Sequence, residues 1–127
     1  MRGDENQVSS VIVDSAVKVH SRLGPGLLES VYEVVLEREL VSRGMDVKRQ
    51  VPVEINYEGI VFEEGFRADL VVNECVLLEL KSVEQMHKIH SKQLFTYLRL
   101  TNIRLGLLLN FGAPLMKEGI KRVANGM

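Results

Sequence analysis

Apolar residues recur at helical spacing in several stretches of the chain. A period of three to four residues indicates a helix with one face packed on a core. The helices predicted in this way cover residues 6–22, 27–43, 86–100 and, as a short last helix, 115–124. The sequence Gly24-Pro25-Gly26 breaks the first helix, and Gly44 stands where a helix commonly ends. We therefore expect two consecutive helices at the start of the fold.

The middle of the chain changes to short apolar runs of the kind that form β-strands. The expected strands cover residues 47–55, 66–72, 76–81 and 103–111, with a further strand beginning at 60–62. Pro52 indicates an edge or a bulge, whereas the near-continuous apolar run 103–111 is typical of a buried central strand. The helix before that run would be a right-handed crossover, which makes 103–111 parallel to its neighbour. The expected fold class is α/β, a mixed sheet flanked by helices.

The runs 66–72 and 76–81 are separated by a short turn, and the loop length decides which residues face each other. A three-residue loop at 73–75 places Asp69 opposite Glu79 and Arg67 opposite Lys81. One face then carries Arg67, Asp69, Val71, Leu77, Glu79 and Lys81. The other face carries Phe66, Ala68, Leu70, Val72, Val76, Leu78 and Leu80, all of them apolar. A two-residue loop would put charges on both faces, so we prefer the first register.

Two carboxylates and a lysine on one face suggest hydrolytic metal chemistry. Asp69 and Glu79 supply the oxygen ligands that Mg²⁺ or Mn²⁺ prefers, and several waters remain on such an ion. Lys81 points to the same face and would position or help to deprotonate an attacking water. A solvated sheet face with cross-strand ion pairs is the competing interpretation, and strand spacing alone slightly favours it.

Two helical segments carry further polar residues at matched spacing. Glu29 and Tyr32 lie three residues apart at the start of the second helix, where a glutamate also complements the helix dipole. On the third helix His90, Gln93 and Tyr97 form a polar stripe, which suits a phosphate or a metal-bound water but is also common at a helix edge. His87 and His90 have the spacing of a zinc pair, yet no cysteine or third histidine supports one.

Composition narrows the function classes. At 127 residues, with 46% hydrophobic and 26% charged residues, the chain has the size of one globular domain, and we expect residues 1–127 to form it. A net charge of -1 gives no general attraction to nucleic acid, so any basic surface must be local. Basic residues do gather at Lys88, Lys92, Arg99, Arg104, Lys117, Lys121 and Arg122. They would contact phosphates or form an ordinary solvated surface.

The cysteine count and the lack of long apolar stretches indicate the cellular compartment. The single cysteine, Cys75, excludes an internal disulfide and a cysteine-rich zinc site. No apolar stretch approaches a membrane span, and the amino terminus has no signal-peptide pattern. We expect a soluble cytoplasmic protein.

Six segments together carry a family resemblance. They are GPGLLESVY (24–32), RQVPV (49–53), FRADLVV (66–72), LLELKSV (77–83), QLFTYLR (93–99) and LGLLLNFG (105–112). In order and spacing they resemble the PD-(D/E)XK nuclease superfamily, and more closely the small bacterial and archaeal proteins of the GxxExxY family. The resemblance extends from about Val11 to Val123 and implies a restriction-endonuclease-like core. Ala68 replaces the proline that names the superfamily, a replacement that is frequent there.

The resemblance also implies site residues. Asp69 and Glu79 would bind one or two divalent metals, Mg²⁺ or Mn²⁺, with Glu29 as a candidate third ligand. Lys81 matches the lysine of the signature, so the implied catalytic residues are Glu29, Asp69, Glu79 and Lys81. Gln93 and Tyr97 would position the substrate or a metal-bound water.

The implied reaction is metal-dependent hydrolysis of phosphodiester bonds, with DNA ahead of RNA as the substrate. The first alternative is a non-catalytic nucleic-acid-binding or assembly module on the same fold. A homodimer or a subunit of a larger complex is the second, and it leaves the charged hairpin face unexplained.

Overall fold

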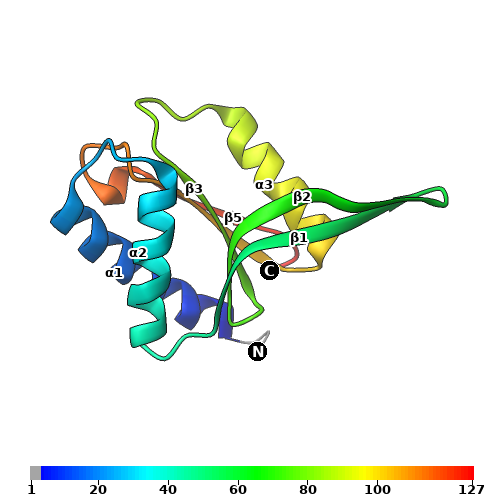
Figure 1. Ribbon diagram of the computed structural model, residues 1–127, viewed down its shortest axis with the longest axis horizontal. Helices are drawn as coiled ribbons and strands as arrows, with labels where there is room; N and C mark the ends of the chain where they lie inside the picture. Colours follow the sequence, from blue (N-terminus) through cyan, green and yellow to red (C-terminus); the bar gives the residue numbers. More distant parts are fainter. Residues whose placement is uncertain (1–3) are drawn as a thin grey trace.

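The computed structural model describes residues 4–127. Residues 1–3 of the domain expected at 1–127 lie outside the described residues. The elements in chain order are α1 (Glu5–Leu23), α2 (Glu29–Ser42), β1 (Val47–Tyr57), β2 (Ile60–Val72), β3 (Val76–Lys81), α3 (Lys88–Thr101), β4 (Leu105–Asn110), the 3₁₀ turn η2 (Met116–Glu118) and β5 (Ile120–Ala124) (Figure 1). Among these residues, no helix has the length and apolar character needed to cross a membrane.

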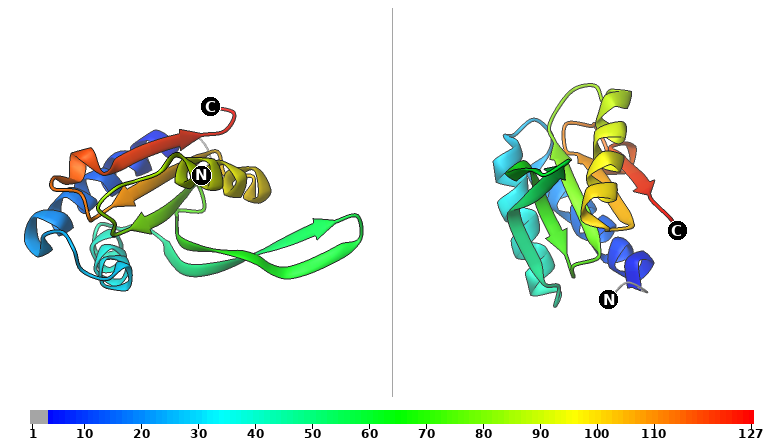
Figure 2. Two further views of the ribbon diagram at one scale, coloured as in Figure 1. Left: turned by 90° about the horizontal axis from the view of Figure 1, so that it is seen from above. Right: turned by 90° about the vertical axis from the view of Figure 1, so that its right-hand side faces the viewer.

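A five-stranded mixed sheet forms the centre of the fold, in the order β1-β2-β3-β4-β5. Strands β3 and β4 are parallel, and the other neighbours are antiparallel. Helix α3 connects the two parallel strands, as the crossover argument predicts. The sheet lies between α1 and α2 on one side and α3 on the other (Figure 2). The predicted α/β class with a mixed sheet is therefore confirmed.

The end of the chain differs from the prediction. The helix expected at 115–124 is wrong, because this segment forms η2 and then β5. Strand β5 pairs with β4 from Leu109 opposite Ile120 to Leu105 opposite Ala124. All six residues of β4 are buried, and a buried strand needs hydrogen-bond partners along both edges. Sheet pairing therefore overrides the local helical spacing in this segment.

Two hydrophobic clusters flank the sheet. The larger one joins buried residues of α1 and α2, such as Ile12 and Leu36, to the sheet. The smaller one lies under α3 and includes Leu94 and Leu98. Because different helices cover the two faces, residues of β2 and β3 that point toward α3 pack in the smaller cluster and not in the larger one.

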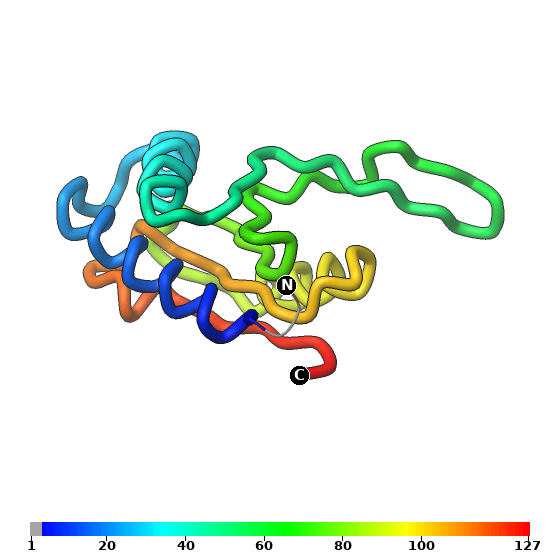
Figure 3. The backbone as a smooth tube through the Cα atoms, turned by 90° about the horizontal axis from the view of Figure 1, so that it is seen from below, coloured from blue at the N-terminus to red at the C-terminus, as the bar shows by residue number. Residues whose placement is uncertain are grey.

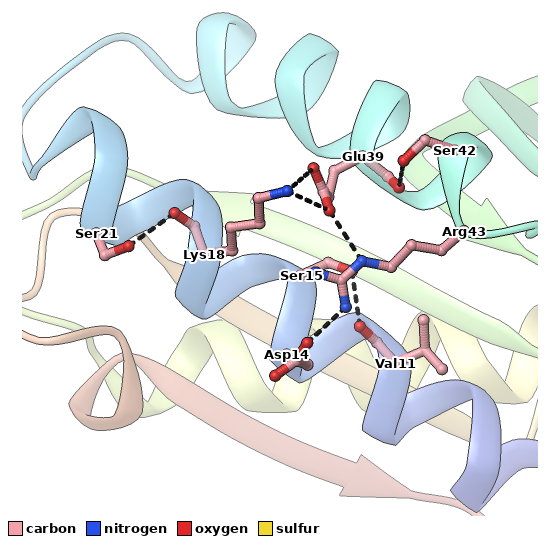
Figure 4. Close-up of polar contacts among 8 residues, drawn as sticks. All are labelled: Val11, Asp14, Ser15, Lys18, Ser21, Glu39, Ser42 and Arg43. Atoms are coloured by element: carbon pink, nitrogen blue, oxygen red, sulfur yellow. Dashed lines mark hydrogen bonds and ion pairs between the residues drawn. The ribbon is translucent and has the colours of Figure 1, made fainter.

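Helices α1 and α2 are also joined at the surface by ion pairs (Figure 4). The Arg43 guanidinium lies 2.6 Å from the Asp14 carboxylate and 2.9 Å from that of Glu39. The Lys18 ammonium is 3.2 Å from Glu39. Ion pairs at the surface contribute little to stability, so burial of the apolar faces is the main force between these helices.

The face assignment along β2 holds for only part of the strand. Leu70 and Val72 belong to the cluster under α1 and α2, as predicted. Phe66 and Ala68, which were expected on the same face, instead belong to the cluster under α3. The alternation therefore changes at Asp69, and the prediction of one continuous apolar face over 66–72 is wrong.

Strands β1 and β2 extend beyond the sheet as a two-stranded ribbon, which we call the arm (residues 54–64). It projects away from the body of the protein (Figures 1 and 3). The runs expected separately at 60–62 and 66–72 belong to the single strand β2. Arg67, near the base of the arm, is opposite Pro52 of β1 and forms an ion pair with Glu64. The predicted placement of Arg67 opposite Lys81 is wrong, because β2 and β3 pair only over Leu70–Val72 and Val76–Leu78.

Candidate metal centre

The Asp69 carboxylate lies where the ladder between β2 and β3 ends. The ladder pairs Val72 with Val76 and Leu70 with Leu78, which confirms the register set by a three-residue loop. One residue further, the Asp69 Oδ2 atom accepts a hydrogen bond of 2.9 Å from the Leu80 backbone N–H. The side chain thus takes the place of a backbone acceptor, and this contact fixes the carboxylate at the start of the opening between the strands.

Glu79 lies next to Asp69 in a largely buried position. Its Oε1 atom is buried and has no hydrogen-bond partner among the described residues. Burial, reinforced by the neighbouring Asp69 carboxylate, raises the pKa of Glu79 to about 9, while Lys81 acts in the opposite direction. Two carboxylates held together away from water cannot both be ionised at neutral pH without a compensating cation. The pair therefore holds a proton at pH 7 that a cation would displace.

Gln50 orients the other side of the Asp69 carboxylate. Its Nε2 atom lies 3.5 Å from Asp69 Oδ1 and donates a hydrogen bond of 2.8 Å to Glu33 Oε1. Glu33 is buried on α2 and also accepts from Arg49 at 2.9 Å. Gln50 has a φ of 51°, in the left-handed region, between the ladder pairs that Arg49 and Val51 form with β2. The sequence analysis missed Gln50, because no local pattern reveals a backbone turned out of the strand conformation.

Tyr97 of α3 lies near this pair of carboxylates, and Gln93 on the same helix hydrogen-bonds to it. The Tyr97 ring stacks on Phe66 with a centroid distance of 3.8 Å and an interplanar angle of 3°. Burial raises the pKa of Tyr97, with the charges of Glu79 and Asp69 adding to the shift, whereas a hydrogen bond with the Gln93 side chain lowers it. The phenol therefore stays protonated at neutral pH and is available as a hydrogen-bond donor. Phe66 was predicted to lie on the opposite face, so its contact with Tyr97 was missed.

Lys81 lies at the end of β3, two residues beyond Glu79. Its backbone carbonyl accepts a hydrogen bond of 2.8 Å from the Phe111 N–H, which holds this end of the strand. Its charge lowers the pKa of Glu79. It also helps to lower the pKa of His90, which is shifted mainly by burial and further by His87. The ammonium therefore acts on both the carboxylate pair and the start of α3.

Glu29 approaches this region from a different element, α2. It is the first residue of α2 and is exposed. The loop before it is attached to the end of β3, because Ser82 Oγ donates a hydrogen bond of 2.6 Å to the Leu27 carbonyl. The Glu29 charge acts against the lowering of the His90 pKa, which places it near the same part of α3. Glu29 thus borders the site from α2.

The structure fits a hard divalent cation at the carboxylate pair. Within residues 4–127, no three histidine, cysteine or acidic side chains lie close enough to hold a metal together. Asp69 and Glu79 are therefore the two side chains that could hold such an ion, and Glu29 is not grouped with them. Mg²⁺ commonly binds through one or two carboxylates and keeps several waters. The unpaired Glu79 oxygen is a free ligand atom of the required kind.

A comparison with known families agrees with this geometry. Residues 6–123 match the family model described as "PD-(D/E)XK nuclease superfamily". The match includes every site residue discussed above. No curated protein shows significant sequence similarity to the chain.

A solved structure shows the same fold. The protein titled "Crystal structure of SSO0001" superimposes with a TM-score of 0.57 at 19% sequence identity. The alignment covers 94% of this chain and 66% of that one, so the chain spans just under two thirds of the length of that protein. At this identity the likeness concerns the fold alone.

Proposed function

Since the chain belongs to the PD-(D/E)XK nuclease superfamily, we propose that it is a divalent-metal-dependent nuclease that hydrolyses phosphodiester bonds, with DNA ahead of RNA as its substrate. Nucleases of this superfamily generally use divalent metal ions. We propose further that it belongs to the finer GxxExxY branch, and the pattern Gly26, Glu29 and Tyr32 supports this assignment. The proposed compartment is the cytoplasm.

One observation carries the proposal. Among residues 4–127, Glu79 Oε1 is buried without a hydrogen-bond partner, beside a second carboxylate whose position is fixed by a backbone N–H. An unsatisfied buried acceptor costs about 1–3 kcal/mol, and a solvated face of ion pairs would leave no such oxygen. A cation bound by Asp69 and Glu79 would satisfy it and would stabilise both charges. The ion-pair interpretation accordingly loses its support.

Each residue then has a role. Asp69 and Glu79 hold Mg²⁺ or Mn²⁺, and Glu29 reaches a water on the ion. Bound metal would polarise the scissile phosphate and make a coordinated water more acidic. Lys81 positions the attacking water and stabilises the developing negative charge.

The third helix supplies the remaining contacts. Tyr97 donates a hydrogen bond to the substrate or to a metal-bound water. Gln93 orients the Tyr97 hydroxyl through the hydrogen bond between the two side chains.

The test is a cleavage panel on single- and double-stranded DNA and RNA, with Mg²⁺, Mn²⁺ or a chelator. We expect cleavage that needs metal and is lost in the Glu79→Gln and Lys81→Ala proteins. Matched controls are Glu74→Gln and Lys48→Ala, which make the same changes at exposed positions and should cleave normally. Circular dichroism should show that all four variants are folded.

Two results would contradict the nuclease proposal or its site. Metal-independent binding without cleavage of any substrate would favour a non-catalytic nucleic-acid-binding or assembly module. Cleavage that persists in folded Glu79→Gln and Lys81→Ala proteins would place the active site elsewhere.

A further inference from the structure

A groove with an excess of positive charge lies on the side of α3 that faces β5. It has a volume of about 460 Å³ and lies between the first turns of α3 and the segment from η2 to β5. Lys88 and Lys92 line it from the helix, and Lys121 lines it from the strand. Glu118 is the acidic residue of the lining. The three lysines and the one glutamate together give a charge of +2.

The three lysines are not neutralised by the fold. Among residues 4–127, Lys88, Lys92 and Lys121 form no ion pair, whereas Arg43, Arg49, Arg67 and Arg104 all do. All three lysines are exposed. Met86 and Ile120 also line the groove, and with the aliphatic part of the lysine side chains they form an apolar wall. A wall of this kind beside cations suits a sugar and its phosphate.

Two histidines at the start of α3 lie between the groove and Lys81 of the candidate metal centre. His87 lines the groove, and its ring centroid is 6.0 Å from that of His90. His90 in turn lies within the electrostatic influence of Lys81. Helix α3 therefore carries Tyr97 near the carboxylates and Lys88 and Lys92 in the lining of the groove.

The arm has the opposite charge and lies on the opposite side. Residues 54–64 contain Glu54, Glu58, Glu63 and Glu64 and no lysine or arginine, which gives a charge of -4. All four glutamates are exposed, and within the described residues only Glu64 forms an ion pair. Phosphates are repelled from such a surface over roughly a Debye length, about 8–10 Å. The charge distribution therefore directs a polyanion away from the arm and toward the groove.

We propose that the Lys88/Lys92/Lys121 groove binds backbone phosphates of a nucleic acid next to the one placed at Asp69 and Glu79. The nucleic acid then crosses the start of α3 and leaves the protein on the β5 side, with the arm free of it. The position of the cleaved phosphate in this arrangement rests on the proposed nuclease function. The phosphate contacts of the groove do not depend on hydrolysis.

The test measures binding without cleavage. Fluorescence anisotropy in chelator gives the Kd of labelled single- and double-stranded DNA at several salt concentrations. The variant Lys88→Glu/Lys121→Glu changes the net charge by -4, since each substitution replaces +1 by -1. Arg38→Glu/Lys48→Glu makes the same change at exposed positions on α2 and β1, and β1 is the opposite edge of the sheet.

We expect the groove substitutions to weaken binding at least about tenfold. They should also lower the slope of log K against log salt by about 2, because two phosphate contacts are lost and each contributes about 0.9 on duplex DNA. The milder Lys88→Gln/Lys121→Gln protein should show the same loss of slope if charge reversal disturbs folding. Equal losses in the groove variant and the control would overturn the proposal, as would an unchanged slope in the groove variants. Slope loss in the groove variants without cleavage by wild type would leave the groove assignment standing and refute the nuclease proposal. Cleavage by wild type together with an unchanged slope in the groove variants would support the nuclease proposal and refute the groove assignment.

Discussion

Metal binding at neutral pH should release about one proton from the protein. The perturbation is titration of the protein with Mg²⁺ or Mn²⁺. Burial and the adjacent Asp69 carboxylate raise the pKa of Glu79 to about 9, so at pH 7 the pair of carboxyl groups holds one proton. A divalent cation binds ionised carboxylates, and the proton must leave when the metal enters.

The size of the pH effect on the metal Kd follows from the difference between pH 7 and the raised pKa of Glu79. When one proton competes with the metal, the apparent Kd rises tenfold for each pH unit below the pKa. Two units separate pH 7 from 9, so the Kd should be about 100-fold weaker at pH 7 than above pH 9. Because the two carboxyl groups interact strongly, the proton belongs to the Asp69–Glu79 pair rather than to one residue.

Isothermal titration calorimetry in buffers of different ionisation enthalpy measures the released proton directly. We expect close to one proton per metal at pH 7 and close to none above pH 9. The Glu79→Gln protein should bind metal weakly and release no proton, whereas the exposed control Glu74→Gln should behave like wild type. Tight binding at pH 7 with no proton release would refute the assignment of the metal to this pair, and so would a Kd independent of pH.

Three further predictions concern stability and the support of the site. The free energy of unfolding of wild type should fall relative to Glu79→Gln as pH rises from 4.5 to about 9, because the folded state holds a proton that the unfolded state releases. The slope of this fall is at most about 1.4 kcal/mol per pH unit. Urea unfolding at several pH values measures it. Gly112→Ala should destabilise the protein by about 2–4 kcal/mol in the same assay, since an added Cβ would lie 2.3 Å from the Val83 carbonyl oxygen. Gln50→Ala should weaken metal binding about 10–100-fold in calorimetry, because Gln50 orients Asp69 from outside the ligand set.

Sequence patterns predicted much of the fold because they reflect local physics. The register of the β2–β3 hairpin followed from loop length and the separation of charges, and the structure pairs Leu70 with Leu78 as that argument requires. The crossover helix and the parallel β4 followed from chain connectivity. The last strand could not be found in this way. Ile120 and Val123 have a spacing compatible with a helix, and only the open edge of β4 makes the segment a strand.

The sequence analysis named the residues of the candidate site, but it could not predict their geometry. Alternation along a strand assumes one uninterrupted ladder, and the ladder of β2 with β3 stops one residue before Asp69. The Gln50 backbone is left-handed at the corresponding point of β1. Phe66 and Ala68 therefore pass to the side of α3, and Phe66 reaches Tyr97. No pattern in a single strand encodes this change of face, because it depends on where a neighbouring strand stops pairing.

The same interruption explains why this position suits a metal. Within a continuous ladder the Leu80 N–H would bind a backbone carbonyl, and Asp69 would have no fixed partner from β3. Because the strands separate here, the N–H holds the Asp69 carboxylate instead. Glu79 then lies beside a fixed negative charge with one buried oxygen left unpaired. A fold selected only for stability would place an apolar side chain at residue 79, since a buried carboxyl without a partner is unfavourable. The unpaired Glu79 oxygen therefore argues for a ligand that the described part of the fold does not supply.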